Sequence, residues 1–427
     1  MIFPSVGKAS DLKLENFGAI ANDEKDDAPA LQAALDELAA VGGGRIIFPP
    51  GQTDILTPVA RDYLNQASSV TFTGLISGSR VRIAVGAGQI GIRLTNVETV
   101  LIEKLVFQGS LAYVTQDPLF FDARYAIQVA SCLRVTIRDC DFYGLAASEF
   151  VLASFSSDLH IEDSSFRGCH AQGVLFSYDW RGLTVRRVDF IDYGALNGVY
   201  HSKSPAFPAA WIYSAVPKPL NNANGERRVV VEDVRLDEAA SNGILIDGAS
   251  FVSIKGVSCN VNGGGSGVGV WLNDVRRAKI EQSFFGYTTQ DRPGVKLSNS
   301  DIIELDSVEF AQGVSHVWTT TNVNWLILRH CKIPPNPAYP QGIKNEGETR
   351  IEVIDNNPVN TVQFAAASFN AQEKAKSATV MLVRSGDTSG AITLDCVAAA
   401  GTATAPADFQ GTPEGVAFRR QRDATFI

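Results

Sequence analysis

The sequence predicts an all-β protein whose main part is a parallel β-helix, a solenoid of about ten coils. The deciding observation is a pattern, apolar-x-apolar-x-x-apolar-x-apolar, that recurs nine times between Val100 and Ile333. Each repeat ends on an anchor residue, and the anchors are Phe107, Phe142, Phe166, Phe190, Leu236, Cys259, Phe285, Phe310 and Ile333. Most anchors lie 23 to 26 residues apart, and the two longer gaps, 107–142 and 190–236, predict insertions.

Each repeat predicts two short strands around a two-residue corner, because alternate residues are apolar on both sides of that corner. A third strand with the pattern Gly-apolar-x-apolar precedes five of them, at 91–94, 173–176, 243–246, 269–272 and 294–297. Leucine-rich repeats have a similar period but need a Leu-x-Leu strand with a fixed Asn or Cys, which is absent. Three strands per coil, each with one apolar side, bury that side only when the coils stack.

Residues 1–60 predict a cap for the first coil. An acidic stretch, Asp23 to Asp27, leads into an Ala-rich segment from Pro29 to Ala40. We expect a helix there, with Asp26 or Asp27 as its N-cap and Gly42 to Gly44 as its stop. The first coil would otherwise leave the end of the core open, so an amphipathic helix is expected to cover it.

This N-terminal part resembles the signature of the pectate-lyase-like superfamily of right-handed β-helices. The matching segments are Asn16-Phe17-Gly18-Ala19, the acidic stretch, the Ala-rich helix, Gly42-Gly43-Gly44 and Phe48-Pro49-Pro50-Gly51. The resemblance implies a right-handed β-helix over residues 61–358. Polysaccharide lyases, glycoside hydrolases, uronate epimerases and phage tailspikes share the signature, so it implies a fold without one activity. The epimerase run Tyr-Gly-Phe-Asp-Pro-His and the polygalacturonase double Asp and Gly-His-Gly are absent.

Residues 359–427 differ from the repeats in composition and resemble the Calx-beta module, a small β-sandwich of surface proteins. The matching segments are Val383-Arg384-Ser385-Gly386, Gly390-Ala391-Ile392-Thr393-Leu394 and Gly401-Thr402-Ala403. The resemblance implies that Glu373 and Asp408 bind calcium, although Ala400 stands where the family usually has Asp. The chain stops at Ile427, before the closing strands of the family, so we expect an incomplete module from a longer protein.

Charge and composition narrow the partners. A net charge of −9 without a basic stripe argues against nucleic acid. No apolar run is long enough to span a membrane. The N-terminus lacks the basic and apolar regions of a secretory signal. Cytoplasmic residence therefore stays open, and the extracellular or cell-surface location that we expect would need signal-less export or release on a phage virion. Cys140, Cys259 and Cys331 fall on core columns, where a free thiol acts as a small hydrophobe.

The chemistry is expected on the outward positions of the glycine-led strands, because the inward residues are packed. Alternation places Tyr200, Asp247, Asn273 and Lys296 outward on one face, where stacked coils about 4.8 Å apart would spread them over roughly 15 Å. That length suits a few sugar residues. Trp271 offers a flat apolar surface to a sugar ring, and Lys296 a charge for a substrate carboxylate.

The insertion from about His201 to Arg227 is expected to form a wall of the same groove, since long excursions from a solenoid are often functional. We predict that the catalytic residues come from Asp192, Tyr200, His201, Lys203, Glu238 and Asp247. We predict that Trp211, Tyr213, Trp271, Asn273 and Lys296 bind the substrate. A Tyr, His or Lys base would serve β-elimination, and paired carboxylates such as Asp192 and Glu238 would serve hydrolysis.

Each of these residues also has a purely structural interpretation. His201 falls on an inward position, and Trp211 and Tyr213 would anchor the loop. Asp247 precedes Gly248, where Asp often caps a turn. Asp192, Glu238 and Lys296 would be ordinary solvated side chains.

Three function classes remain open. The first, which the insertion and the aromatic residues favour, is an enzyme that binds and cleaves an extracellular polysaccharide as a lyase or a glycoside hydrolase. The second is a phage tailspike that binds or depolymerises a surface glycan as a homotrimer. The third is a non-catalytic adhesin or spacer, favoured by the weak catalytic signature. No cofactor is predicted beyond the calcium that the C-terminal resemblance implies.

Overall fold

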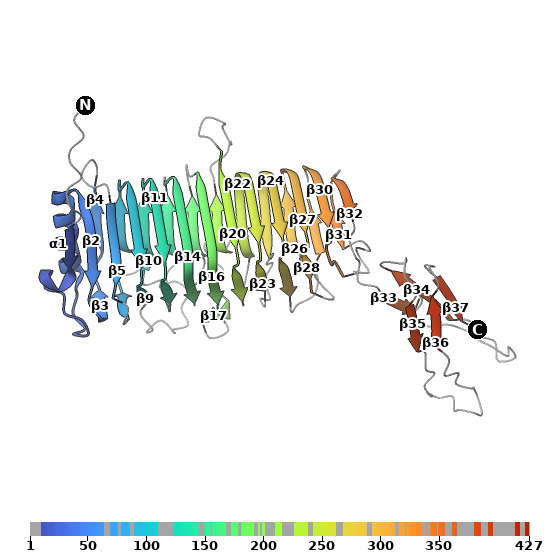
Figure 1. Cartoon of the computed structure of the whole chain (residues 1–427), viewed down its shortest axis with the longest axis horizontal. Helices are drawn as coiled ribbons and strands as arrows, with labels where there is room; N and C mark the ends of the chain where they lie inside the picture. Colours follow the sequence, from blue (N-terminus) through green and yellow to red (C-terminus); the bar gives the residue numbers. More distant parts are fainter. Residues whose placement is uncertain are drawn as a thin grey trace, which may run out of the picture.

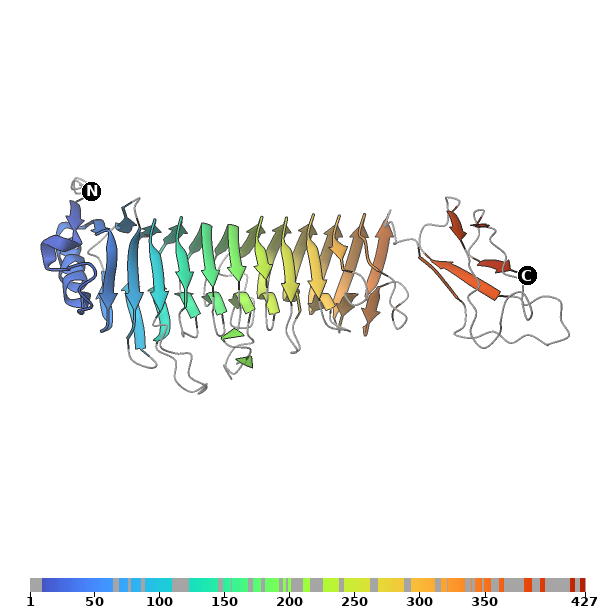
Figure 2. The ribbon, with the colours of Figure 1, turned by 90° about the horizontal axis from the view of Figure 1, so that it is seen from below.

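In the computed structural model, the described residues are 10–63, 69–75, 78–85, 89–109, 123–144, 149–154, 156–167, 172–177, 181–191, 195–196, 199–200, 210–215, 226–237, 242–261, 268–287, 293–311, 316–320, 322–334, 339, 342–347, 349–354, 361–364, 380–385, 392–395, 415–418 and 423–426. Strands stack along one long axis, with a helix at the N-terminal end (Figures 1 and 2). The predicted parallel β-helix is confirmed, because every coil strand pairs in parallel with its equivalent in the next coil.

Three faces make up the solenoid. The glycine-led face consists of β4 (Val59–Asp62), β7 (Gln89–Thr95), β10 (Ala123–Ala130), β13 (Glu149–Ser154), β15 (Gln172–Ser177), β19 (Ala210–Ala215), the first parts of β22 (Asn242–Lys255) and β24 (Val270–Glu281), β26 (Pro293–Ser298), β29 (His316–Thr319) and β31 (Ile343–Asn345).

The middle face follows the glycine-led face along each coil. It consists of β1 (Ser10–Lys13), β2 (Gly43–Phe48), β5 (Ser69–Gly74), β8 (Thr99–Glu103), β11 (Arg134–Arg138), the first parts of β14 (Asp158–Arg167) and β16 (Gly182–Ile191), β20 (Arg228–Glu232), the second parts of β22 and β24, β27 (Ser300–Asp306), β30 (Val323–Arg329) and β32 (Arg350–Ile354).

The anchor face completes the coil. It consists of β3 (Gly51–Ile55), β6 (Ser79–Ile83), β9 (Val106–Gly109), β12 (Asp141–Tyr143), the ends of β14 and β16, β21 (Arg235–Asp237), β23 (Ser258–Val261), β25 (Phe284–Tyr287) and β28 (Glu309–Phe310).

Four of the anchor residues form a ladder of stacked aromatic rings in the core. The rings of Phe107, Phe142, Phe166 and Phe190 stack on successive coils with centroid separations of 4.8, 4.6 and 4.9 Å. All four side chains are fully buried. Their separation equals the spacing of paired parallel strands, so the backbone ladder itself brings the rings into contact. The register read from the repeats is therefore confirmed.

The corner between the middle and anchor faces is a column of left-handed residues. Asp139, Asp163 and Asp233 are three of them, with φ between 51 and 53°. In this conformation the chain turns while its N–H groups still reach the next coil, as Asp139 N–H does at the Glu162 carbonyl (3.3 Å). Asn and Asp tolerate positive φ better than most residues, and Gly256 occupies the same position in its coil.

The residues two positions before each anchor form a further column, which is apolar except for Ser164 and Ser283. Both serines are buried, and both hydroxyl groups are hydrogen-bonded. The Ser164 hydroxyl donates to the Glu162 carbonyl (2.8 Å) and accepts the Cys140 N–H (3.2 Å). Ser283 does the same with Glu281 and Val257. A serine is tolerated in this column because the hydroxyl satisfies backbone groups that the corner leaves unpaired.

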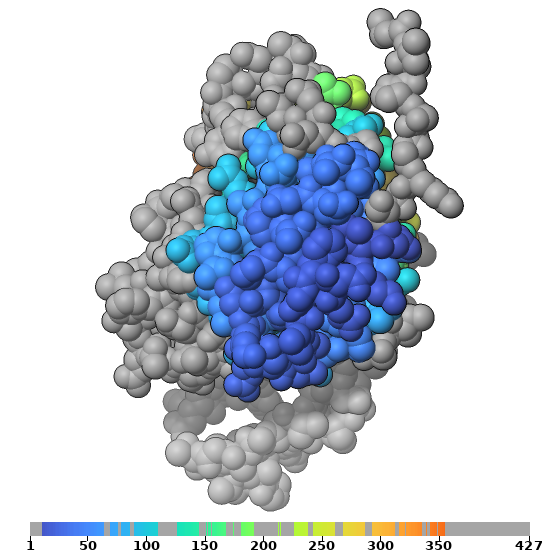
Figure 3. All heavy atoms as spheres, turned by 90° about the vertical axis from the view of Figure 1, so that its left-hand side faces the viewer, coloured from blue at the N-terminus to red at the C-terminus, as the bar shows by residue number. Residues whose placement is uncertain are grey.

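The predicted capping helix is present as α1 (Ala28–Val41), after the 3-10 helix η1 (Leu14–Phe17). Leu31, Leu35 and Leu38 are fully buried against the first coil. Gly42 ends the helix at φ 85°, with its N–H on the Leu38 carbonyl. Seen end-on, the N-terminal residues cover the end of the solenoid (Figure 3).

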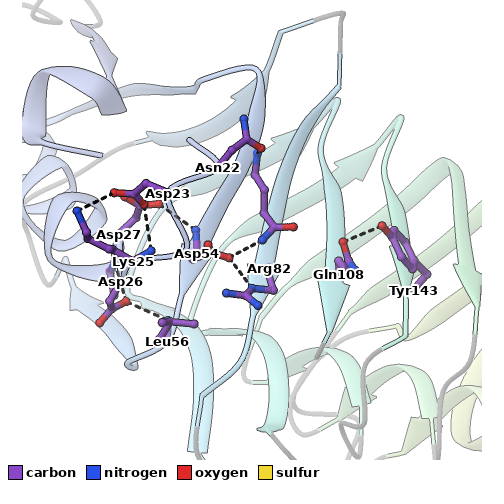
Figure 4. Close-up of polar contacts among 12 residues, drawn as sticks. Asn22, Asp23, Lys25, Asp26, Asp27, Asp54, Leu56, Arg82, Gln108 and Tyr143 are labelled. Carbon is purple, nitrogen blue, oxygen red and sulfur yellow. Dashed lines mark hydrogen bonds and ion pairs between the residues drawn. The ribbon is translucent and has the colours of Figure 1, made fainter. Parts of the chain in front are cut away.

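The acidic stretch has a role that the helix-cap expectation did not include. It seals the open edge of β3, where Asn22, Asp27 and Asp26 side chains accept the N–H groups of Gln52, Asp54 and Leu56, each at 2.9 Å (Figure 4). The Asp27 carboxylate makes no cap bond to the helix, whereas Asp26 accepts the Ala28 N–H (3.1 Å). An unpaired strand edge invites association with another chain, and this stretch removes it.

The insertion between 190 and 236 differs from the prediction. The coil strand of this turn is β19, which pairs with β15 on one side and β22 on the other. Tyr200 lies instead in β18 (Val199–Tyr200), paired antiparallel with β17 (Ala195–Leu196). The expectation that Tyr200 occupies the coil strand is wrong, and the expected wall 201–227 contains a strand of the solenoid with Ile212 fully buried.

The C-terminal region forms separate antiparallel pairs. β34 (Val380–Ser385) pairs with β33 (Thr361–Phe364) and β37 (Asp423–Phe426), and β35 (Ile392–Asp395) pairs with β36 (Gly415–Phe418). Glu373 and Asp408 lie outside the described residues. Within the described part of the chain, no helix is long and apolar enough to cross a membrane, and no His, Cys, Asp and Glu side chains are grouped to hold a metal ion.

Candidate functional site

A column of aromatic and basic side chains runs along the outside of the glycine-led face at its C-terminal end. The register pairs Trp271 of β24 with Lys296 of β26, Lys296 with Trp318 of β29, and Trp318 with Lys344 of β31. All four are partly buried. We call these four residues the Trp–Lys column.

The lysines of the Trp–Lys column lie over indole rings. Lys296 Nζ is 4.0 Å from the centroid of Trp271 and 4.6 Å from that of Trp318. Lys344 Nζ lies 4.2 Å from Trp318. Cations within about 6 Å of a ring centroid are attracted by its quadrupole. The column is therefore an alternating stack, in which the rings hold the ammonium groups at fixed heights along the axis.

The two lysines differ in their electrostatic surroundings. Burial lowers the pKa of Lys296, an effect that the charge of Glu346 opposes and that of Lys344 assists. Among the described residues, no carboxylate lies within ion-pair distance of Lys296. Lys344 pairs with Glu346 at 2.8 Å, and its hydrogen bond lowers the pKa of that carboxyl. Lys296 is thus a cation held by aromatic rings without a described counter-ion.

A hydrogen-bonded network joins the Trp–Lys column to a carboxylate. Trp271 Nε1 donates to Ser298 Oγ (3.0 Å), and Ser298 Oγ donates to Asn273 Oδ1 (2.9 Å). Asn273 Nδ2 in turn donates to Asp247 Oδ1 (2.6 Å). Asn299 Nδ2 also donates to Asn273 Oδ1 (2.9 Å). The network fixes the indole and the Asp247 carboxylate relative to each other, and leaves the other carboxylate oxygen of Asp247 without a described bond.

Four of the predicted site residues are brought together. Asp247 and Asn273 are paired across β22 and β24, next to Trp271 and Lys296. The aromatic ring faces are not bare platforms as expected, because ammonium groups lie against them. A ligand would meet ring edges, held ammonium groups and the amide and hydroxyl groups of the network.

Among the other predicted residues, Tyr213 lies in the same column of the register, with Leu245 between it and Trp271. Tyr200 lies in the β17–β18 hairpin. Tyr213 is paired with Leu245 and occupies the coil-strand position expected for Tyr200. Trp211 lies in the same strand, β19. Asp192, His201, Lys203 and Glu238 lie outside the described residues.

Leu245 departs from its expected exposure. Its partners, Tyr213 and Trp271, define an outward position. The side chain is nevertheless only 2% exposed, and it does not belong to the core cluster.

Sequence reasoning missed Trp318, Lys344 and Glu346. A signal for Lys344 exists, since Gly342-Ile343-Lys344 begins like the other glycine-led strands. His316-Val317-Trp318 has the alternation without the glycine, so its register could not be aligned from the pattern.

Comparison with known proteins agrees with the fold. The model of the right-handed β-helix region matches residues 63–285, about half of the chain. The chain belongs to the right-handed β-helix family. The Calx-beta domain model matches residues 355–427 of this β-helix protein, in agreement with the resemblance of the C-terminal segment. A search of curated proteins found no match.

Solved structures resemble this right-handed β-helix protein in fold. A variant of DFA-IIIase from Arthrobacter chlorophenolicus A6, in complex with DFA-III, is 11% identical with a TM-score of 0.52, covering 83% of this chain and 96% of that one. The Agl-KA catalytic domain is 12% identical with a TM-score of 0.50, covering 81% and 69%. The Streptococcus pneumoniae surface adhesin PfbA is 12% identical with a TM-score of 0.47, covering 82% and 98%. At these identities the likeness is one of fold.

Proposed function

We propose that this right-handed β-helix protein binds an extracellular polysaccharide along its glycine-led face and cleaves it. The observation that carries the proposal is the Trp–Lys column beside the Asp247–Asn273 pair. Aromatic, cationic, amide and carboxylate groups there follow one another on successive coils. Sugars are bound by such combinations, because their rings have apolar faces and their rims are hydroxyl groups.

The shape of the site favours a polymer over a small molecule. The column extends over the strands β24, β26, β29 and β31, with about 4.8 Å between neighbours. A ligand that touches every rung must be extended and must lie along the axis. A polysaccharide chain satisfies both conditions.

Cleavage is the finer part of the proposal. In β-elimination a positioned base removes a proton while a cation, here Lys296 of the Trp–Lys column, neutralises the substrate carboxylate. Asp247 would act in hydrolysis together with a second carboxylate from Asp192 or Glu238. Tyr200, His201 and Lys203 are the remaining candidates for proton transfer.

The wider context supports the proposal at the level of class. DFA-IIIase, one of the fold relatives, has been solved with a bound saccharide, DFA-III. The Calx-beta segment supports an extracellular or cell-surface place for the protein. Calcium at Glu373 and Asp408 belongs to the same proposal.

A polysaccharide panel tests binding and cleavage separately. Purified bacterial and plant polysaccharides are assayed for binding, for the absorbance of unsaturated uronates and for new reducing ends. We expect one polymer to bind and to give one of the two product signals. Binding without product would establish a glycan-binding surface protein, such as an adhesin or a non-cleaving tailspike. The absence of binding across the panel would refute the proposal.

A further inference from the structure

We infer that the Trp–Lys column selects a polysaccharide in which an anionic sugar alternates with a neutral one. The inference rests on the proposed function, because it names the substrate class of the same surface. It depends on the order of the four side chains, Trp, Lys, Trp, Lys, on neighbouring rungs.

The two lysines of the Trp–Lys column have a defined spacing along the axis. Lys296 and Lys344 are separated by one rung, which Trp318 occupies. Two rungs of a parallel sheet amount to roughly 10 Å. One sugar of an extended pyranose chain is comparable in length to the distance between neighbouring rungs. The two ammonium groups therefore match charges on every second sugar.

This spacing is rigid. A surface lysine is normally a mobile point charge on a flexible stem. Here Lys296 is held between two indole rings, at 4.0 and 4.6 Å, and Lys344 lies on the other side of Trp318 at 4.2 Å. Trp271 is fixed in turn by its bond to Ser298. The lysines thus cannot shift by one rung without losing their ring contacts.

Both charges are available to a ligand. No carboxylate among the described residues lies within ion-pair distance of Lys296, and the charge of Glu346 acts on it from farther away, so an anionic group of a ligand would be attracted to this cation. The partner of Lys344, Glu346, is 45% exposed in its side chain. An exposed ion pair of this kind contributes little, so a ligand carboxylate competes with it easily.

The column does not match a polymer that carries a charge on every sugar. A polymer with a carboxylate on every sugar would place one at the level of Trp318, where the ring offers no cation. An uncharged sugar at this level meets an apolar ring edge instead. The column therefore discriminates against homopolyuronates as well as against neutral chains.

Binding of defined polymers tests the inference. Hyaluronan, heparosan and unsulfated chondroitin alternate a uronate with a neutral amino sugar. Their carboxyl-reduced forms are neutral, and polygalacturonate carries a charge on every sugar. At physiological salt, we expect at least one alternating polymer to bind on the order of tenfold more tightly than its reduced form and than polygalacturonate, as one charge-assisted contact requires.

Two variants locate the effect. Lys296→Met should remove most of the preference for the alternating polymer. The matched control, Lys255→Met, removes an exposed lysine of the middle face and should leave the preference unchanged. Trp318→Lys supplies the missing charge between Lys296 and Lys344 and should shift the preference toward polygalacturonate. Thermal unfolding of each variant shows whether the fold is retained.

The outcomes separate this inference from the proposed function. If neutral chains or polygalacturonate bind best, or if Lys296→Met leaves the preference intact in a folded protein, alternating-charge selection is refuted while glycan binding stands. If no polymer of any class binds, both the proposed function and the inference are refuted.

Discussion

The outer surfaces of the middle face and of the glycine-led face treat their charges in opposite ways. At the corner end of the middle face, Glu103, Arg138, Glu162, Arg186 and Glu232 are successive partners in the register, so their signs alternate. Ion pairs join Arg138 to Glu103 (2.7 Å) and Arg186 to Glu232 (2.6 Å). These five charges neutralise one another from coil to coil.

On the glycine-led face the cations alternate with tryptophans, and Lys296 has no described carboxylate partner. A charge that is balanced inside the chain holds the register of the coils, whereas one held by an aromatic ring stays available to a ligand. The comparison separates structural ladders from candidate binding surfaces on a scaffold whose strands look alike. Substitutions in the core, on each face and at the end of the solenoid test this difference between structural and ligand-binding charges.

The largest effect is expected in the core, which both faces share. Phe166→Ala removes a ring stacked between Phe142 and Phe190. We expect a loss of about 3–5 kcal/mol in the free energy of unfolding, from lost burial and from the cavity. Equilibrium unfolding in urea measures it. A loss below about 1 kcal/mol would mean that the ladder is not the tightly packed core described here.

The second effect concerns acid stability on the middle face. Burial opposes ionisation of Glu103, but hydrogen bonds from Arg138 and Thr73 outweigh it and hold the pKa of Glu103 below its usual value. A depressed carboxyl pKa stabilises the fold above the unfolded pKa, about 4.3, and this contribution is lost as the pH falls through the lower folded value.

Glu103→Gln should therefore destabilise the protein at pH 7 by about 1–3 kcal/mol, because the Arg138 guanidinium loses its partner. The difference between variant and parent should shrink as the pH falls below about 4. Glu232→Gln, whose carboxylate is more exposed, serves as a control and should change less. Thermal unfolding across pH 3–7 measures both, and a pH-independent difference for Glu103→Gln would contradict the assignment.

On the glycine-led face we expect function to change more than stability. Trp271→Ala and Asp247→Asn alter outward side chains, so the free energy of unfolding should fall only slightly, by about 0.5 kcal/mol or less for Asp247→Asn. Glycan binding or cleavage should be impaired in both variants. Lys255→Met on the middle face is the control. If the two variants bind and turn over an identified glycan like the parent, the site lies elsewhere on the solenoid.

The smallest effect is expected at the C-terminal end. Removing residues 359–427 should leave a folded β-helix with nearly the same melting temperature, because solenoid coils contact only their neighbours. Circular dichroism during thermal unfolding measures the strand signal and its cooperativity. A truncated chain without a cooperative transition would show that the segment is needed to close the last coil.

The local sequence pattern was enough to predict the strands of each coil and the residues that they bury. The nine repeats placed each anchor and its companion columns inward, and the structure buries them, because period-two alternation leaves one choice of face for a strand with one apolar side. The capping helix followed equally well, since Ala-rich propensity and Gly42 act locally. Four of the site residues, Asp247, Trp271, Asn273 and Lys296, were predicted on the face they occupy.

Three features depend on contacts between coils and could not be read from the local pattern of the chain. Between anchors 190 and 236 the sequence offers more than one alternating segment, and pairing with β15 and β22 selected Tyr213 over Tyr200. The same holds for the Trp–Lys column, whose members are far apart in sequence and meet only because stacked coils superimpose them. The sealing of β3 by Asn22, Asp26 and Asp27 also depends on where the folded chain brings their oxygens. Such contacts do not recur with a period in the sequence, so no periodic pattern could predict them.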